Sequence, residues 1–198
     1  MTGDYKLKIT ARILMMALPM FLTRGAFAQQ QTFTVDPAAS SIGFALTGSG
    51  HEVHGTFHVT GGTIQYDRNA PKMSGSVVVS AGSGDSGDKG RDKNMHEKVL
   101  EIDRFADITF QPQSYSGTIA PSGDSTIQVS GVFTLHGTPH DLSMPMQVHI
   151  DGQNVTAKGS FVVPYVKWGL KDPSIFVLKV AKEVHIDLNL AGTESPAK

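Results

Sequence analysis

Alternation of apolar and polar side chains with a period of two runs through this chain from Phe33 to Leu190. The clearest runs cover residues 127–135 and 184–190, where apolar residues or glycine occupy every second position. This pattern is typical of β-strands with one buried face. Asp151-Gly152 stands between two alternating runs and is a strong hairpin signal. The chain is therefore expected to be all-β, with antiparallel neighbouring strands.

One segment departs from this alternation. Between Arg91 and Phe105 the apolar side chains Met95, Val99, Ile102 and Phe105 are spaced by four, three and three residues. That spacing places them on one face of a helix. The pattern predicts one short helix near residues 91–103. The stretch before it, residues 82–90, is rich in Gly, Ser and Asp and is expected to be a flexible loop.

Long alternating antiparallel strands either stack as a sandwich or close as a barrel. Runs of nine or ten residues with one face of large side chains favour an antiparallel, lipocalin-like barrel of about eight or more strands. The interior of such a barrel is either filled by its own side chains or leaves room for a ligand. Composition does not separate these two cases.

The first 28 residues have the organisation of a secretory signal peptide. Three basic residues precede a ten-residue apolar core at 13–22, and Ala26-Phe27-Ala28 supplies a small-x-small cleavage site. The apolar core is too short to span a membrane. We therefore expect cleavage after Ala28, a single domain over residues 29–198, and a periplasmic or secreted location.

Composition narrows the classes of function. The full chain has a formal net charge of −1, and removing residues 1–28 leaves 13 basic and 17 acidic residues. An acidic domain without a basic run has no electrostatic reason to bind nucleic acid or anionic lipid head groups, and no stable membrane insertion is expected. The absence of Cys excludes disulfides, thiolate metal sites and Cys nucleophiles.

Three motifs invite chemical hypotheses. Residues 82–87 match G-x-G-x-x-G, and residues 84–87 read GDSG, but no βαβ unit and no matching His segment accompany them. Among the eight His, His54 and His58 lie about 13 Å apart on a strand, which is too far to bind one metal ion together. A weak site formed by His136 and His140 stays open, and no catalytic residue or metal ligand is assigned.

The linear order of several segments resembles the YceI-like family of bacterial secreted proteins, over residues 33–190. Each segment is short, but their order and spacing together are specific. Ala39 stands where the family has His, so any polar contact of that His is missing. The matching segments are FTVDP (33–37), SSIGF (40–44), HGTF (54–57), GTIQYD (62–67), RD (91–92), ITF (108–110), VSGVFTLHG (129–137), WG (168–169) and VHIDL (184–188).

The resemblance implies a lipocalin-like barrel whose apolar tunnel binds a polyisoprenoid lipid, such as a prenyl quinone or polyprenyl pyrophosphate, without cofactor or catalysis. Arg91 is the candidate contact for a polar head group, with an ion pair to a local carboxylate as its alternative. The residues expected to contact the ligand are Phe44, Leu46, Phe57, Arg91, Phe110, Phe133, Met144, Met146, Phe161 and Trp168.

One further hypothesis on function stays open: a periplasmic stress-response protein that binds a metal through surface His or acts through a protein partner. Separately, an exposed strand edge would allow a homodimer. An enzyme would need converging polar groups in the cavity, whereas the inward-facing positions are almost wholly apolar.

Overall fold

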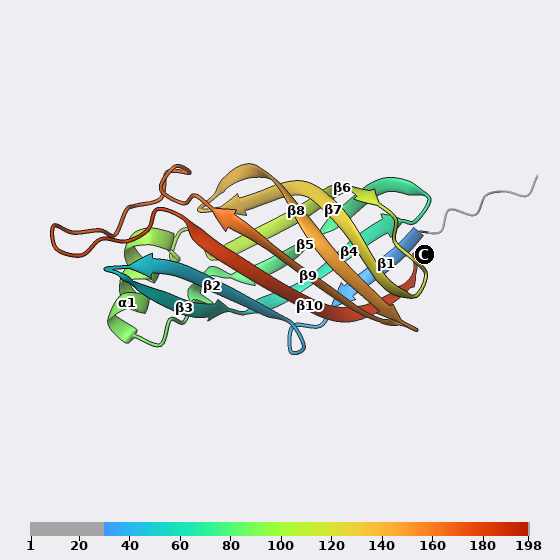
Figure 1. Ribbon diagram of the computed structural model, residues 1–198, viewed down its shortest axis with the longest axis horizontal. Coiled ribbons are helices and arrows are strands. Elements are labelled where there is room, and N and C mark those ends of the chain that lie inside the picture. Colours follow the sequence, from blue (N-terminus) through green and yellow to red (C-terminus); the bar gives the residue numbers. More distant parts are fainter. Residues whose placement is uncertain (1–29, 198) are drawn as a thin grey trace, which may run out of the picture.

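The computed structural model describes residues 30–197, so the expected signal peptide lies outside the described residues. The described chain is mostly strand, with a short helical segment between the fifth and sixth strands (Figure 1). The strands are β1 (Gln30–Val35), β2 (Ser41–Gly48), β3 (His51–Phe57), β4 (Val59–Asp67), β5 (Ala70–Ser80), β6 (Asp107–Gly117), β7 (Gly123–Leu135), β8 (Thr138–Asp151), β9 (Asn154–Val163) and β10 (Val184–Pro196).

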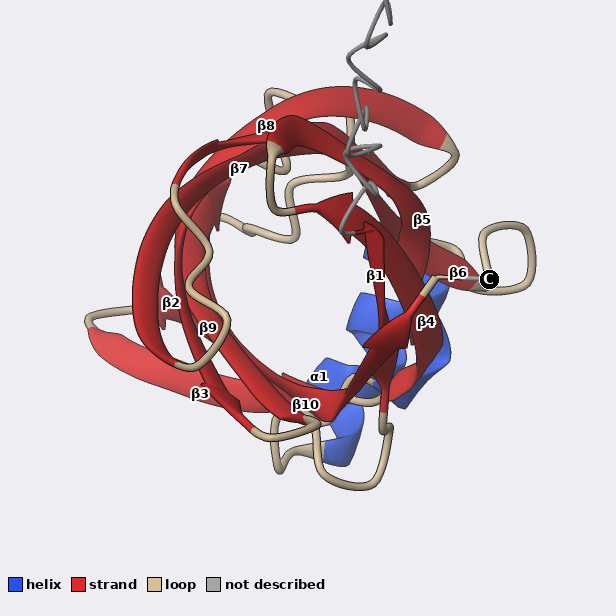
Figure 2. Ribbon diagram, turned by 90° about the vertical axis from the view of Figure 1, so that its right-hand side faces the viewer, coloured by secondary structure: helices blue, strands red, loops and turns tan. Residues whose placement is uncertain are grey.

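Eight strands close into an antiparallel barrel, which confirms the expected fold class. Their order is β1-β4-β5-β6-β7-β8-β9-β10, and pairing of β1 with the C-terminal part of β10 closes the ring. Figure 2 shows this ring from one end. The alternation in the sequence explains the shared apolar interior, because every strand keeps one apolar face toward the axis.

Strands β2 and β3 extend the barrel wall at one end. β1 pairs with residues 192–196 of β10, and after a short turn β2 pairs with residues 185–189 of the same strand. β3 runs directly into β4, with only residue 58 between them. The two extra strands therefore continue the paths of β1 and β4 rather than forming a second sheet. Ala39 lies exposed in the turn between β1 and β2.

The helical segment begins earlier than the sequence predicts and contains a wider turn. α1 (Lys89–Asn94) is capped by the Asp88 side chain, which accepts a hydrogen bond from the Arg91 amide, and it continues as a π-helical turn, η2 (Met95–Leu100). A π-turn shifts the next buried position by one residue. Leu100 is consequently buried on the inner face, although the predicted stripe did not include it. Ile102 and Phe105 follow the helix.

The Gly-rich stretch before α1 is not the flexible loop that composition suggested. It begins with a short 3₁₀ turn, η1 (Ala81–Ser83), and Asp85 exchanges two backbone hydrogen bonds with Thr56 of β3, at 2.9 and 3.0 Å. Gly84 is buried, and a Cβ there would come within 2.6 Å of Met95 and 2.8 Å of Phe57. Glycine therefore serves here for close packing between this segment, β3 and η2.

The apolar side chains form two clusters inside the barrel. The larger lines the middle of the barrel and the end remote from α1, and the smaller joins Leu100 to Phe133, Leu135, Val163, Tyr165 and Leu170 at the helix end. Phe57, Ile108, Phe110, Leu142 and Phe161 contact both clusters. Within residues 30–197, no helix has the length and hydropathy needed to cross a membrane.

Candidate functional site: an apolar cavity in the barrel

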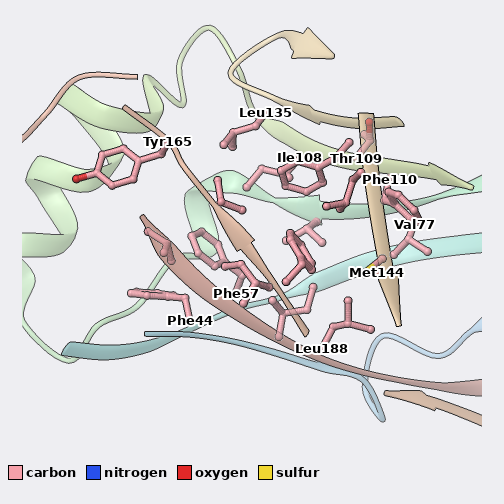
Figure 3. Close-up of a pocket in the computed structure, with 18 of the residues that line it drawn as sticks. Phe44, Phe57, Val77, Ile108, Thr109, Phe110, Leu135, Met144, Tyr165 and Leu188 are labelled. Atoms are coloured by element: carbon pink, nitrogen blue, oxygen red, sulfur yellow. The ribbon is translucent and has the colours of Figure 1, made fainter. Parts of the chain in front are cut away.

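A cavity of about 600 Å³ occupies the barrel interior. Inward-facing side chains of the strands form its wall, and η2 and the segment between β9 and β10 complete it at one end. Figure 3 shows Phe44, Phe57, Phe110, Met144 and Leu188 directed into this space. A cavity of this size lies within the range of small-molecule sites. The interior is therefore not fully packed by its own side chains.

The structure places nine of the ten sequence-predicted residues on the cavity wall. They come from six different strands and from α1, and only the folded barrel brings them together. These residues are Phe44, Leu46, Phe57, Arg91, Phe110, Phe133, Met144, Met146 and Phe161.

Trp168 is the exception, because it does not line the cavity. Residues 164–170 form a tight turn after β9, in which the Trp168 amide donates to the Pro164 carbonyl at 3.0 Å. The turn directs the indole onto His140, with ring centroids 4.0 Å apart and nearly parallel planes, and against Phe133 at 5.9 Å. Trp168 thus packs behind the cavity wall. The sequence-based prediction had placed Trp168 among the residues that contact the ligand.

Several wall residues were not predicted. η2 contributes Met95, Val99 and Leu100, and the segment after β9 contributes Tyr165 and residues 178 and 180. The helical stripe at Met95 and Val99 gave a usable signal, because an amphipathic helix in a barrel protein must bury its apolar face against something. Residues in the segment after β9 carry no periodic signal that could have placed them.

Aromatic rings make part of the wall rigid. Phe44 and Phe57, on paired strands, have ring centroids 5.3 Å apart, and Phe133 meets Phe161 edge to face at 5.5 Å. Methionines 144 and 146 lie on β8, between the strands that carry Phe133 and Phe161. Their unbranched thioether side chains adapt more readily to the shape of a ligand.

The charged residues of the wall lie at the helix end, which we call the mouth. Ser86, Asp88, Arg91 and Asn94 line the cavity there. Arg91 donates from Nε to the Ser86 hydroxyl at 2.7 Å and from Nη2 to the Ser86 carbonyl at 2.8 Å. Within the described residues Arg91 makes no ion pair, in contrast to the alternative considered from the sequence. Its charge is therefore available to an anionic group at the mouth.

A second polar group lies at the opposite end of the barrel, which we call the far end. Arg68, in the turn after β4, bonds both carboxylate oxygens of Glu194 on β10 at 2.7 Å. The hydroxyl of Tyr66 donates to the same carboxylate. The two charged side chains are only 11% and 10% exposed. Burial, followed by the hydrogen bond to Glu194, raises the pKa of the Tyr66 phenol far above its usual value of 10.0.

The histidines do not converge on a common point. His54, His58, His149 and His185 are exposed, as their strand positions predicted. His136 Nε2 lies 2.5 Å from Glu101 Oε2, whereas His140 stacks on Trp168, so the two do not form the loop site left open above. In the described part of the chain, no group of three His, Cys, Asp or Glu side chains could hold a metal ion.

A closed antiparallel barrel around an apolar cavity, with a helix at one end, gives this molecule a lipocalin-like fold. The sequence shows which group of such proteins is involved: the chain belongs to the YceI-like family, because the model of the YceI-like domain matches residues 33–191. Proteins of this family are binding proteins. A search of curated proteins found no match.

Solved structures share the fold at low sequence identity. BcnA from Burkholderia cenocepacia superposes with a TM-score of 0.66 at 20% identity, covering 80% of this chain and 99% of that one. A polyisoprenoid-binding domain from Saccharophagus degradans, implicated in plant cell wall breakdown, superposes with a TM-score of 0.62 at 16% identity, over 83% and 98%. Both comparisons support the eight-strand barrel with its additional strands.

Proposed function

We propose that this protein holds a long apolar isoprenoid lipid, a prenyl quinone or a polyprenyl pyrophosphate, inside its barrel. It does so in the periplasm or outside the cell, for transport, storage or protection against stress, and without catalysing a reaction. The observation that carries this proposal is the interior cavity, whose wall is largely apolar and has its charged residues at the mouth.

The energetics of transfer favour such a ligand. Each CH₂ group moved from water into an apolar site gains about 0.8 kcal/mol, so a long isoprenoid chain gains a large total. The wall made by Phe44, Phe133 and Phe161 with Met144 and Met146 offers contacts along a chain without requiring polar groups on it. A small polar metabolite would leave its hydrogen bonds unmade in this space.

The mouth suits the polar end of the same ligand. Arg91 makes its hydrogen bonds to Ser86 with two guanidinium nitrogens, and the side chain is otherwise exposed. A guanidinium group pairs well with phosphate oxygens. The apolar chain would lie among the strands and a pyrophosphate or quinone head would lie near α1.

Further support comes from the relatives and from the N-terminal sequence. The domain from Saccharophagus degradans is described as polyisoprenoid-binding and shares this barrel. The basic, apolar and small-residue order of residues 1–28 supports export. Export would place the protein in an aqueous compartment, where an isoprenoid lipid needs a carrier because its solubility is very low.

The proposal is tested by mass spectrometry of an organic-solvent extract of the exported protein, purified from its native host. We expect a stoichiometric prenyl lipid. The variant Ala157→Trp places a large side chain on the cavity wall and should reduce the lipid recovered by about tenfold or more.

Lys158→Trp is the matched control, because it adds the same side chain at the next, exposed position of β9 and should leave the lipid content unchanged. Both variants are first shown to be folded by circular dichroism. A folded wild-type protein without lipid, or equal lipid in Ala157→Trp and wild type, would falsify the proposal.

A further inference from the structure

The segment between β9 and β10 carries an exposed apolar tip, Ile175–Leu178. Phe176 is 95% exposed and Val177 is 81% exposed, and both neighbours are exposed as well. Of the five large apolar side chains that are exposed in the described chain, four are these consecutive residues. A concentration of exposed apolar surface in one place marks an interaction site more often than scattered single residues do.

The tip is a fixed hairpin rather than a loose loop. The Ile175 amide donates to the Leu178 carbonyl at 2.9 Å, which places Phe176 and Val177 at the two turn positions. At the base, the Val180 amide donates to the Ser174 hydroxyl at 3.0 Å. These bonds hold Phe176 and Val177 outward, away from the barrel interior where other large apolar residues are buried.

The base of the hairpin is also tied to the barrel wall. The Ser49 amide donates to the Lys179 carbonyl at 2.7 Å, and the Ala181 amide donates to the Thr47 carbonyl at 2.8 Å, both at the end of the β2–β3 hairpin. The Tyr165 hydroxyl donates to the Ala181 carbonyl at 2.8 Å. The tip is therefore presented by a rigid support.

The apolar tip stands beside the mouth. Pro173, Leu178 and Val180, which flank or belong to the tip, also line the cavity. Figure 1 shows the segment in orange and red, extending beyond the strands at the end where α1 lies. Any surface that accepts Phe176 and Val177 would consequently lie next to the opening of the cavity.

Charge is distributed unevenly between this segment and the rest of the domain. Residues 164–183 contain four lysines and two acidic residues, whereas the remainder of residues 29–198 contains nine basic and fifteen acidic residues. All four lysines are exposed. Of these four, only Lys182 makes an ion pair within the described residues, with Asp172 at 3.9 Å. The segment is thus a basic and apolar projection on an otherwise acidic protein.

We propose that the apolar tip and its lysines dock this protein onto a membrane surface that contains anionic lipids. Phe176 and Val177 would enter the boundary between head groups and acyl chains, and Lys171 and Lys179 would lie at the level of the anionic head groups. Aromatic and aliphatic side chains flanked by lysines are the combination that interfacial membrane anchors use. Docking in this way turns the mouth toward the bilayer.

A membrane fits this surface better than a protein partner does. Four side chains on a narrow hairpin offer far less than the roughly 800 Å² per partner that a stable protein interface buries. A second copy of this acidic chain would also be repelled over most of its surface. An anionic bilayer repels the acidic barrel and attracts the lysines, and this combination orients the molecule with the tip toward the lipid.

The inference goes beyond the proposed function, because it is tested with vesicles that contain no isoprenoid. The full-length gene is expressed, and the exported protein is centrifuged with vesicles of phosphatidylethanolamine and phosphatidylglycerol or of phosphatidylcholine alone. We expect binding to the anionic vesicles that weakens at high salt.

The double variant Phe176→Ser/Val177→Ser should bind at least about tenfold more weakly. Val162→Ser, an exposed apolar residue on β9, is the matched control and should bind as wild type does.

A second variant reports on the tip directly. Phe176→Trp keeps the side chain aromatic, and its fluorescence should shift to shorter wavelength when anionic vesicles are added, whereas the parent protein, with only Trp168, should show no shift. Three results would overturn the proposal: a wild-type protein that stays in the supernatant, equal binding by wild type and Phe176→Ser/Val177→Ser, or a dimer in analytical ultracentrifugation that only the double variant abolishes. The last result would assign the tip to a second copy of the chain.

Discussion

The two ends of the barrel each contain an arginine, and the two arginines are used differently. Arg68 at the far end is largely buried, bonds both oxygens of Glu194 and lies over the Tyr66 ring at 5.7 Å. Arg91 at the mouth is exposed, and in the described chain its side chain bonds only Ser86. A buried charge needs its partner within the protein, whereas an exposed one remains available to a ligand.

The same contrast extends to the surrounding structure. The far end has a self-contained polar group between the turn after β4 and the last part of β10. The mouth has α1, η2 and the hairpin of the apolar tip. Backbone bonds tie the hairpin to β2 and the turn after it, and they tie the segment before α1 to β3. We infer that the far end maintains the closed barrel and that the mouth exchanges the ligand. Three measurements test this distinction.

The largest effect is expected for Glu194→Ala. Removing one partner of a buried ion pair leaves Arg68 charged, buried and uncompensated, which costs about 3–5 kcal/mol. The free energy of unfolding from urea denaturation should fall by that amount. The lipid bound by the protein that remains folded should not change, because Glu194 is not on the cavity wall.

The double variant Arg68→Met/Glu194→Leu is the control for this interpretation. It removes both charges and replaces them with apolar side chains, so it should regain most of the lost stability. A loss below about 1 kcal/mol in Glu194→Ala would mean that the pair is effectively solvated. In that case the far end would not differ from the mouth in the way described.

Sequence reasoning predicted the barrel but not this ion pair. Alternation fixes which face of each strand is buried, and the inward positions Leu188 and Leu190 were assigned correctly from it. Glu194 lies on that same face four residues later, where the rule predicts an apolar residue. Its partner Arg68 lies 126 residues away, in a turn without periodicity. The pairing depends on barrel closure between β1, β4 and β10, which no local pattern encodes.

The mouth shows the same division between local and long-range information. The stripe at Met95 and Val99 was recognisable because a helix has its own periodicity, and Arg91 was proposed from the resemblance to the YceI-like family. The π-turn that buries Leu100 and the turn that moves Trp168 onto His140 were not, since both are set by packing against neighbouring strands. The apolar tip was also missed, because its exposure is visible only once the hairpin is in place.

Arg91→Ala is expected to have an intermediate effect, on binding rather than on folding. Its two bonds are exposed and local, so the free energy of unfolding should change by less than about 0.5 kcal/mol. Loss of a charge-assisted hydrogen bond should weaken the binding of a polyprenyl pyrophosphate by about tenfold. Titration of both ligands, the pyrophosphate and the uncharged polyprenol, measures this difference.

Arg104→Ala is the matched control, because Arg104 is also exposed but does not line the cavity. It should leave both affinities unchanged. If Arg91→Ala weakens polyprenol and pyrophosphate binding equally, the arginine acts through the shape of the mouth rather than through its charge. The contrast with Arg68 would then concern burial alone.

The smallest effect is expected at the bond that fastens η2 to the barrel. Glu101, which follows η2, bonds His136 in the turn between β7 and β8, and this bond holds the pKa of the Glu101 carboxyl below its usual 4.5. A depressed native pKa stabilises the folded state above the unfolded value, and that contribution is lost as the pH falls through the native pKa. The melting temperature of Glu101→Gln should therefore lie below that of wild type near neutral pH, and this difference in melting temperature should disappear in acid.

Glu97→Gln, which removes only a 3.9 Å pair with Lys93, controls for loss of charge. A gap that stays constant from neutral pH to acid would assign the effect to packing at the mouth instead of to the carboxylate.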